Sequence, residues 1–360
     1  MTKLLFYIFC APIFFYFSPA GVPTLSDIPG IDISPKNQYA IPIIILLYTL
    51  LATKKLKFSY IDLCLTIPCV FVLFTSVLLG LDNLRFYFVP IAAIAWLIFF
   101  DPMPKRPDSV RLNLSRVSLL LTSIYGLCAL IAFPSLIPIA QFFSIFNLYQ
   151  YGPSILSIFL LIHLGLNRPN NIRLFFGILG ICLIFTLSYA TDGDAFLIFS
   201  PFLLIPLLLN HFRLRYRTAI SNISLAIMIF IVITFPFIGI KVYPTDFQTL
   251  NIRFAQFSMI FENWVYFFNP FWNVWRLGAH GSMHNELVES ISIFGAFGPL
   301  ILVRIYYKLS IFLNHLGCAY SPYVLIVFLF SGLTILPLFN FYLFSLFVLI
   351  SRISYPRRRH

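Results

Sequence analysis

The sequence predicts an all-α, polytopic membrane protein with about 12 transmembrane helices, and three observations predict it. Hydrophobic residues make up 60% of the 360 residues and charged residues only 10%, so a water-soluble domain of this size would lack a polar surface. Long apolar runs recur along the chain, and most Lys and Arg residues cluster between them. We therefore expect a single transmembrane domain over residues 1–360.

The predicted spans follow the apolar runs in order. Crossing a bilayer takes about 20 apolar residues, and open sheet edges do not survive in hydrocarbon, so each run is expected to be helical. The first run follows Lys3, lacks a clean small-x-small cleavage site and is followed by many more apolar runs, which favours a retained helix over a signal peptide. The runs lie at residues 4–20, 40–53, 59–80, 85–100, 116–135, 151–166, 172–190, 195–210, 218–240, 286–303, 322–337 and 338–352.

The distribution of Lys and Arg predicts the orientation. With the N-terminus in the cytoplasm, 19 of the 24 basic residues fall in cytoplasmic segments, so the positive-inside rule favours this orientation. Both termini are cytoplasmic if residues 322–352 form two helices that part near Pro337. One kinked helix is the alternative, and the four arginines after Ser351 disfavour it. The net charge of +12 thus reports topology, and no nucleic-acid partner is expected.

The longest predicted outside segment is the loop from Val242 to His284, which has 43 residues and three of the four tryptophans. Long loops without obvious secondary structure are usually functional. Residues 254–268 carry aromatic side chains at helical spacing, which favours a helix anchored in the membrane interface over a sugar-stacking platform. Four side chains in the loop can be cationic, and together they suit an anionic ligand such as a lipid diphosphate: Arg253, Arg276, His280 and His284.

The sharpest local pattern follows this loop and consists of His284-Asn285, nine residues, Gly295 and Gly298. If one helix begins by His284, the histidine and both glycines share a face against which another helix can pack closely. A simpler interpretation is that Asn285 caps a transmembrane helix, that acidic residues in its first turn favour its positive end, and that the glycines only pack.

This pattern resembles the H-[NSQ]-x9-G-x-x-[GTY] signature of the O-antigen polymerase (Wzy) and O-antigen ligase (WaaL) superfamily. The run Asn251-Ile252-Arg253-Phe254 is similar to the family's arginine followed by a helix, and Asn269-Pro270 to its N-P turn. The resemblance covers residues 186–298. Asp194 stands where many members carry an arginine, which favours the polymerase over the ligase.

The resemblance implies a metal-independent, inverting glycosyltransferase of the membrane-embedded GT-C type, without a cofactor. It would act in lipopolysaccharide biosynthesis on undecaprenyl-diphosphate-linked oligosaccharide, at the periplasmic face of the bacterial inner membrane. Membrane lipid and a chain-length regulator protein would be its partners.

The same resemblance assigns the site residues. His284 would be the base that activates the acceptor hydroxyl, while Arg253 and Arg276 would bind the diphosphate of the donor. This chemistry fits the side chains, because an imidazole titrates near neutral pH and guanidinium groups can stabilise a diphosphate leaving group. Further residues are predicted to bind substrate: His280, Asn285, Glu286 and Asp194.

Other functions remain open on the sequence alone. A ligase would transfer the glycan to the lipid A-core. Asp192-Gly193-Asp194 is a D-x-D pattern typical of metal-dependent transferases, although Asp and Gly also favour turns. A flippase for the same glycan would need broken helices and ionisable residues at mid-bilayer, for which the sequence offers only His163, Asp62 and Glu289. Finally, the loop could dock a partner without catalysis.

Overall fold

The computed structural model describes residues 59–80, 85–132, 148–190, 199–212, 217–242, 286–332, 338–339 and 341–352. Within these ranges every regular element is a helix and no strand occurs, so the all-α prediction is confirmed for this part of the chain. The first two predicted spans and the long loop after Val242 lie outside the described residues.

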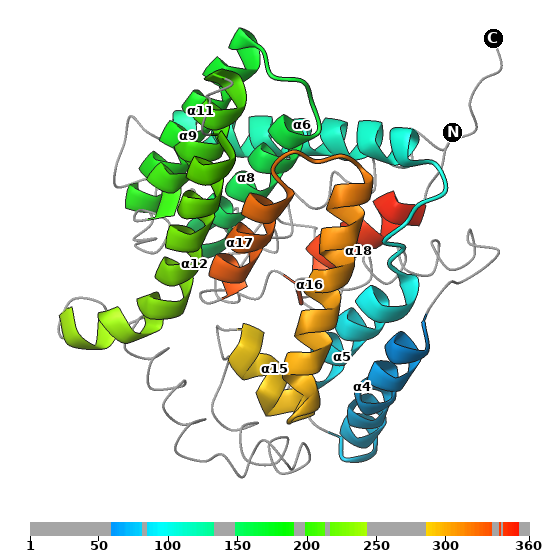
Figure 1. Cartoon of the computed structure of the whole chain (residues 1–360). Coiled ribbons are helices and arrows are strands. Elements are labelled where there is room, and N and C mark those ends of the chain that lie inside the picture. The colour runs from blue at the N-terminus through cyan, green and yellow to red at the C-terminus, as the bar shows by residue number, and fades with distance from the viewer. Residues whose placement is uncertain are drawn as a thin grey trace, which may run out of the picture.

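The helices follow the predicted spans in chain order (Figure 1). α6 begins at Pro107 rather than near residue 116, because proline suits the first helical position and Asp108 favours the positive end of the helix. The bounds are α4 (Tyr60–Leu78), α5 (Arg85–Ile94), η3 (Ala95–Phe99), α6 (Pro107–Ala132), α8 (Leu148–Gly165), α9 (Asn171–Ala190), η4 (Ser200–Leu203), α11 (Leu204–Phe212), α12 (Arg217–Val242), α15 (Glu286–Phe294), α16 (Phe297–His315), α17 (Ser321–Gly332) and α18 (Phe341–Arg352).

Helix α4 has its polar residues inside and its apolar residues outside. It buries Asp62, Thr66 and Ser76, whereas Ile67 and Phe74 are 64% and 60% exposed. By length and composition, α4 is the one described helix that could cross a membrane, and several other described helices are apolar but shorter. The start of α4 is fixed by a capping box, in which Ser59 and Asp62 exchange hydrogen bonds of 3.0 and 3.1 Å.

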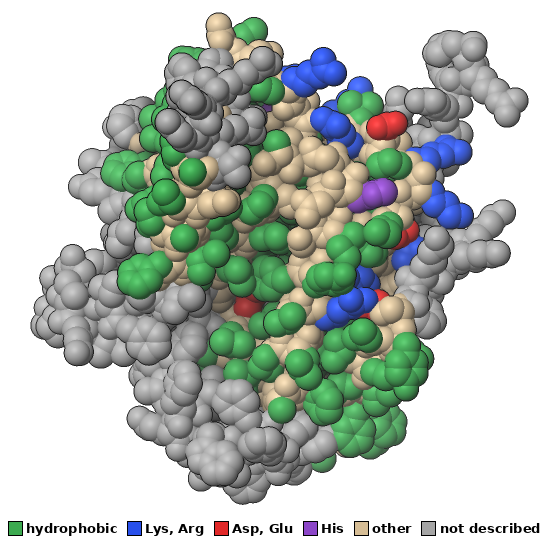
Figure 2. Space-filling model, in the orientation of Figure 1, with side chains coloured by type: hydrophobic (Ala, Val, Ile, Leu, Met, Phe, Trp, Pro, Cys, Tyr) green, Lys and Arg blue, Asp and Glu red, His purple; other side chains and the backbone are tan. Residues whose placement is uncertain are grey.

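Several helix ends that carry basic residues meet at one end of the bundle, and Figure 2 shows Lys and Arg side chains gathered over the upper right of the visible face. Arg111 Nε donates to the carbonyl of Leu166 at 2.9 Å, which joins the start of α6 to the end of α8. His315 at the end of α16 lies 3.3 Å from the carbonyl of Pro104, in the segment after η3. These contacts join segments that the sequence analysis assigns to the same side of the membrane.

The predicted span 286–303 is not one helix. The chain turns at Gly295, whose φ of +59° is a left-handed conformation that side chains rarely adopt, and α16 then packs back against α15 (Figure 1). Gly298 lies so close to α15 that a Cβ at this position would be 2.3 Å from the carbonyl oxygen of Ser290. The expectation that Gly295 and Gly298 lie on one face of one helix is therefore wrong, because Gly295 lies in the turn between two helices and Gly298 in the first turn of the second.

Residues 322–352 form two helices, not one kinked helix. α17 ends at Gly332 and α18 begins at Phe341, with a turn at 338–339 between them. The residues leading into α17 lie beside the end of α8, where the N–H of Ala319 donates to the carbonyl of Gly165 at 2.9 Å. At the other end of the pair, Arg352 Nε donates to the carbonyl of Phe99 at 2.6 Å. Both contacts are made near the basic helix ends, so the start of α17 and the end of α18 lie on the same side of the bundle.

Candidate functional site

Among the site residues predicted from the sequence, the structure describes Glu286. The other six lie outside the described residues: His284, Arg253, Arg276, His280, Asn285 and Asp194. The convergence of the histidine and the two arginines therefore stays a prediction. Glu286 is the first residue of α15 and comes directly after the His284-Asn285 pair, so it shows where the chain enters the bundle after the long loop.

The carboxylate of Glu286 is buried and bonded to the protein. The residue is 2% exposed, and its Oε2 accepts a hydrogen bond of 3.1 Å from the hydroxyl of Tyr306. Its Oε1 accepts a short hydrogen bond from the backbone N–H of Leu338. Glu286 was predicted to bind substrate. In the structure, both of its carboxylate oxygens instead accept hydrogen bonds from protein groups.

Glu286 lies near the middle of the bundle rather than at the end of a span. Its partner Tyr306 is the central residue of α16, with nine residues on each side. A helix of 19 residues is about 28 Å long, so Tyr306 lies roughly 14 Å from either end of α16. The sequence analysis placed Glu286 at the outer end of one long helix. The fold places it deeper, because α15 is a short helix that runs back along α16.

The carboxylate of Glu286 contacts the segment between α17 and α18, and this segment in turn contacts the π-helical turn η3. Leu338 lies between α17 and α18; its N–H contacts Glu286, and its carbonyl accepts a hydrogen bond of 2.7 Å from the indole of Trp96. Gly332, at the end of α17, leaves the space that the carboxylate fills, since a Cβ there would be 2.8 Å from Oε2. We call Glu286, Tyr306, Gly332, Leu338 and Trp96 the Glu286 junction. In the sequence, the sign of this junction was Glu286, the acidic residue directly after the His284-Asn285 pair.

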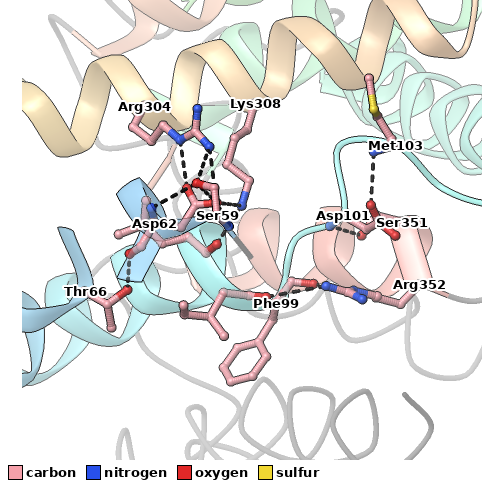
Figure 3. Close-up of polar contacts among 12 residues, drawn as sticks. Ser59, Asp62, Thr66, Phe99, Asp101, Met103, Arg304, Lys308, Ser351 and Arg352 are labelled. Carbon is pink, nitrogen blue, oxygen red and sulfur yellow. Dashed lines mark hydrogen bonds and ion pairs between the residues drawn. The ribbon is translucent and has the colours of Figure 1, made fainter. Parts of the chain in front are cut away.

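A second buried polar cluster joins α4 to α16 (Figure 3). Arg304 binds Asp62 through Nε at 2.8 Å and through Nη2 at 3.2 Å, and Nη2 also donates to the Ser59 hydroxyl at 2.9 Å. The ammonium of Lys308 lies 3.7 Å from Asp62 Oδ2 and donates to the carbonyl of Leu97 at 2.6 Å. Two cations thus flank one carboxylate. From the sequence, Arg304 and Lys308 were expected only as cytoplasmic positive charges, and their pairing with Asp62 was not predicted.

The cluster also completes the end of the π-helical turn η3. Such turns leave carbonyl groups without a regular helical partner, and the carbonyl end of a helix attracts positive charge. Lys308 from α16 binds the carbonyl of Leu97, and Arg352 from α18 binds those of Ile98 and Phe99 (Figure 3). The basic side chains of Lys308 and Arg352 therefore have a structural role where α16 and α18 meet η3.

His163 was another ionisable residue that the sequence places within a span. It is buried, and its Nδ1 lies 3.0 Å from the carbonyl of Ser115 and 3.3 Å from the hydroxyl of the same residue. It therefore links α8 to α6 near the end of α8. Among the residues that the structure describes, no group of three or more His, Cys, Asp or Glu side chains could hold a metal ion. Asp192 and Asp194 are not among them.

Comparison with known proteins adds no relative. No protein-family model matches the chain, and no curated protein or solved structure is significantly similar to it.

Proposed function

We propose that the chain is a multi-pass protein of the bacterial inner membrane, with about 12 spans and both termini in the cytoplasm. The polarity of α4 supports this, because Asp62, Thr66 and Ser76 face the interior while Ile67 and Phe74 face outward. A surface helix in water has the opposite arrangement. Exposed apolar side chains continue over α9, α12 and α16, as expected of a surface in contact with acyl chains: Ile172, Phe175, Ile223, Phe230, Leu300 and Val303.

We further propose that the chain polymerises undecaprenyl-diphosphate-linked O-antigen repeat units at the periplasmic face, by inverting glycosyl transfer without a metal or cofactor. One observation carries the proposal: the backbone conformation and the packing require glycine at both glycine positions of the motif. Gly295 adopts a positive φ, and Gly298 has no room for a Cβ. The motif thus folds α15 onto α16 and starts α15 near the middle of the bundle, two residues after His284.

In the proposed reaction, a hydroxyl oxygen of the acceptor sugar attacks the anomeric carbon of the donor. The bond between this carbon and the diphosphate oxygen breaks, and the acceptor proton passes to His284. Arg253 and Arg276 stabilise the negative charge on the departing undecaprenyl diphosphate, as guanidinium groups do when they bind phosphate oxygens. His280, Asn285 and Asp194 are proposed to contact the sugars.

The test is a gel of surface polysaccharide from a deletion strain that carries either the native chain or His284→Ala. We expect the variant to lose polymer of modal length while single repeat units still reach the surface, because the general base is missing. A lipid A-core without any glycan would instead identify a ligase. Unchanged chain length would refute the catalytic role and favour a docking function. Strong inhibition of the purified protein by EDTA, with rescue by Mn²⁺ or Mg²⁺, would favour a metal-dependent transferase.

One observation favours a second candidate, a flippase for the same lipid-linked glycan. Transporters often have interrupted helices and an ionisable residue near mid-bilayer, and the Glu286 junction joins a buried carboxyl group, beside the middle of α16, to the segment between α17 and α18. The location of repeat units in the deletion strain separates the two functions. Loss of a polymerase leaves unpolymerised units on the outer face, whereas loss of a flippase leaves untranslocated units on the cytoplasmic face.

A further inference from the structure

We infer that Glu286 is a positioning residue that holds the start of α15, and with it the adjoining His284-Asn285 pair, and that it does not bind sugar. The inference rests on the proposed function, because it assigns a role within that site. It replaces the substrate-binding role that the sequence analysis gave to this carboxylate.

The contacts of Glu286 reach elements that are distant in sequence. Tyr306 belongs to the middle of α16, and Leu338 lies between α17 and α18, 52 residues further along the chain than Glu286. The 2% exposure leaves no carboxylate surface for a ligand. Glu286 therefore connects the first turn of α15 to two other parts of the bundle.

The length of α15 explains why it needs such an anchor. The helix has nine residues, and helices this short are only marginally stable unless packing holds them. The middle of α15 is held by the close packing of Gly298 against Ser290. Its first turn is held by the hydrogen bonds of Glu286 with Tyr306 and Leu338.

Gly332 provides an independent way to disturb the same contact. A Cβ at residue 332 would be 2.8 Å from Glu286 Oε2 and 3.5 Å from the hydroxyl of Tyr306. Alanine otherwise favours helix over glycine, so the main expected effect of Gly332→Ala is displacement of the carboxylate. The glutamate itself stays unchanged in this variant.

The experiment compares Glu286→Ala, Glu286→Gln and Gly332→Ala in the purified full-length protein, with undecaprenyl-diphosphate-linked repeat units as substrate. A glutamine can accept from the Leu338 N–H and donate to the Tyr306 hydroxyl, so it can replace both contacts without a charge. We expect kcat to fall at least about tenfold in Glu286→Ala and Gly332→Ala, with KM changed less than about twofold. Glu286→Gln should keep at least about half of the native kcat.

A second readout does not depend on activity. Amide hydrogen exchange over residues 286–294 should accelerate in Glu286→Ala and Gly332→Ala, and should stay near the native rate in Glu286→Gln. Tyr306→Phe removes one contact and should give a smaller acceleration. Tyr307→Phe is the matched control, because Tyr307 is 55% exposed and its ring is retained, and we expect native behaviour in both measurements.

The outcomes separate the two proposals. If Glu286→Gln loses as much kcat as Glu286→Ala, the charge itself takes part in the reaction and the positioning role is overturned. Native exchange and native kcat in Glu286→Ala, together with an inactive His284→Ala, would overturn the positioning role and leave the proposed function standing. If the native chain forms no polymer and His284→Ala has no effect in cells, the proposed function fails, and the exchange measurement still decides whether Glu286 holds α15.

Discussion

Asp62 shows how one side chain can serve several neighbours. It caps α4 through Ser59, binds Arg304 at 2.8 Å and lies 3.7 Å from the ammonium of Lys308. Lys308 is 2% exposed, so without Asp62 its charge would stay buried beside the carbonyl of Leu97, with no neighbouring carboxylate from α4. Removing one member of a buried ion pair costs more than the net contribution of the pair, since the remaining charge is uncompensated.

Asp62→Asn should therefore lower the free energy of unfolding by about 3 kcal/mol. The measurement is the thermal unfolding of the purified protein in detergent. The shift in Tm is converted to a change in the free energy of unfolding with the unfolding enthalpy measured for the same protein. Asp108→Asn is the control, because Asp108 is an exposed carboxylate in the first turn of α6, and its effect should be within about 0.5 kcal/mol. Equal losses in the two variants would show that the buried cluster adds no stability.

At the scale of elements, the hairpin of α15 and α16 depends on a residue without a side chain. Gly298→Ala would place a methyl group 2.3 Å from a backbone oxygen of α15, which cannot rotate away as a side chain can. The two helices must therefore separate, and the start of α15 must shift with them.

We expect Gly298→Ala to abolish polymer on the surface-polysaccharide gel while the protein still reaches the membrane at a reduced level. Leu300→Ala is the control on the same helix, since Leu300 is exposed and its truncation leaves the hairpin contact intact. A normal polymer ladder in Gly298→Ala would contradict the role given to the hairpin.

The same hairpin shows how far the sequence can predict these elements. Apolar runs located α4, α5, α8, α9 and α12 well, because apolar runs of that length favour buried or lipid-facing helices over strands. The break at Gly295 was missed, since hydropathy does not report a positive φ. The motif was found from its spacing, but the sequence analysis joined its two glycines on one helix.

The candidate site was predictable only in part, for a related reason. Glu286 was among the residues predicted to bind substrate, yet its partners Tyr306, Gly332 and Leu338 are 20 to 52 residues away and follow no local pattern. The pairing of Asp62 with Arg304 spans 242 residues. Such contacts arise from tertiary packing, which composition and spacing do not encode. The convergence of His284, Arg253 and Arg276 stays a prediction.

At the scale of the whole molecule, the basic side chains gather at one end of the described bundle, where they also bind helix carbonyls (Figures 2 and 3). The proposed topology places this end in the cytoplasm. The turn after α4, at residues 79 and 80, belongs to the other side.

This orientation can be measured with single cysteines placed at Lys105 and Leu79 in a background without the six native cysteines. A maleimide that cannot cross the inner membrane should label residue 79 in intact cells, because the proposed topology exposes it to the periplasm. Residue 105 should react only after the inner membrane is opened. The reverse pattern would invert the topology and place the long loop in the cytoplasm.

A helix that begins halfway through a bundle constrains its surroundings. The first N–H groups of α15 cannot be left to acyl chains, which accept no hydrogen bonds, so protein or water has to meet them. In an enzyme that acts on sugars, a hydrated vestibule leading down to this depth would meet that need. It would also give hydroxyl groups a path from the aqueous phase to a centre that lipid tails would otherwise seal.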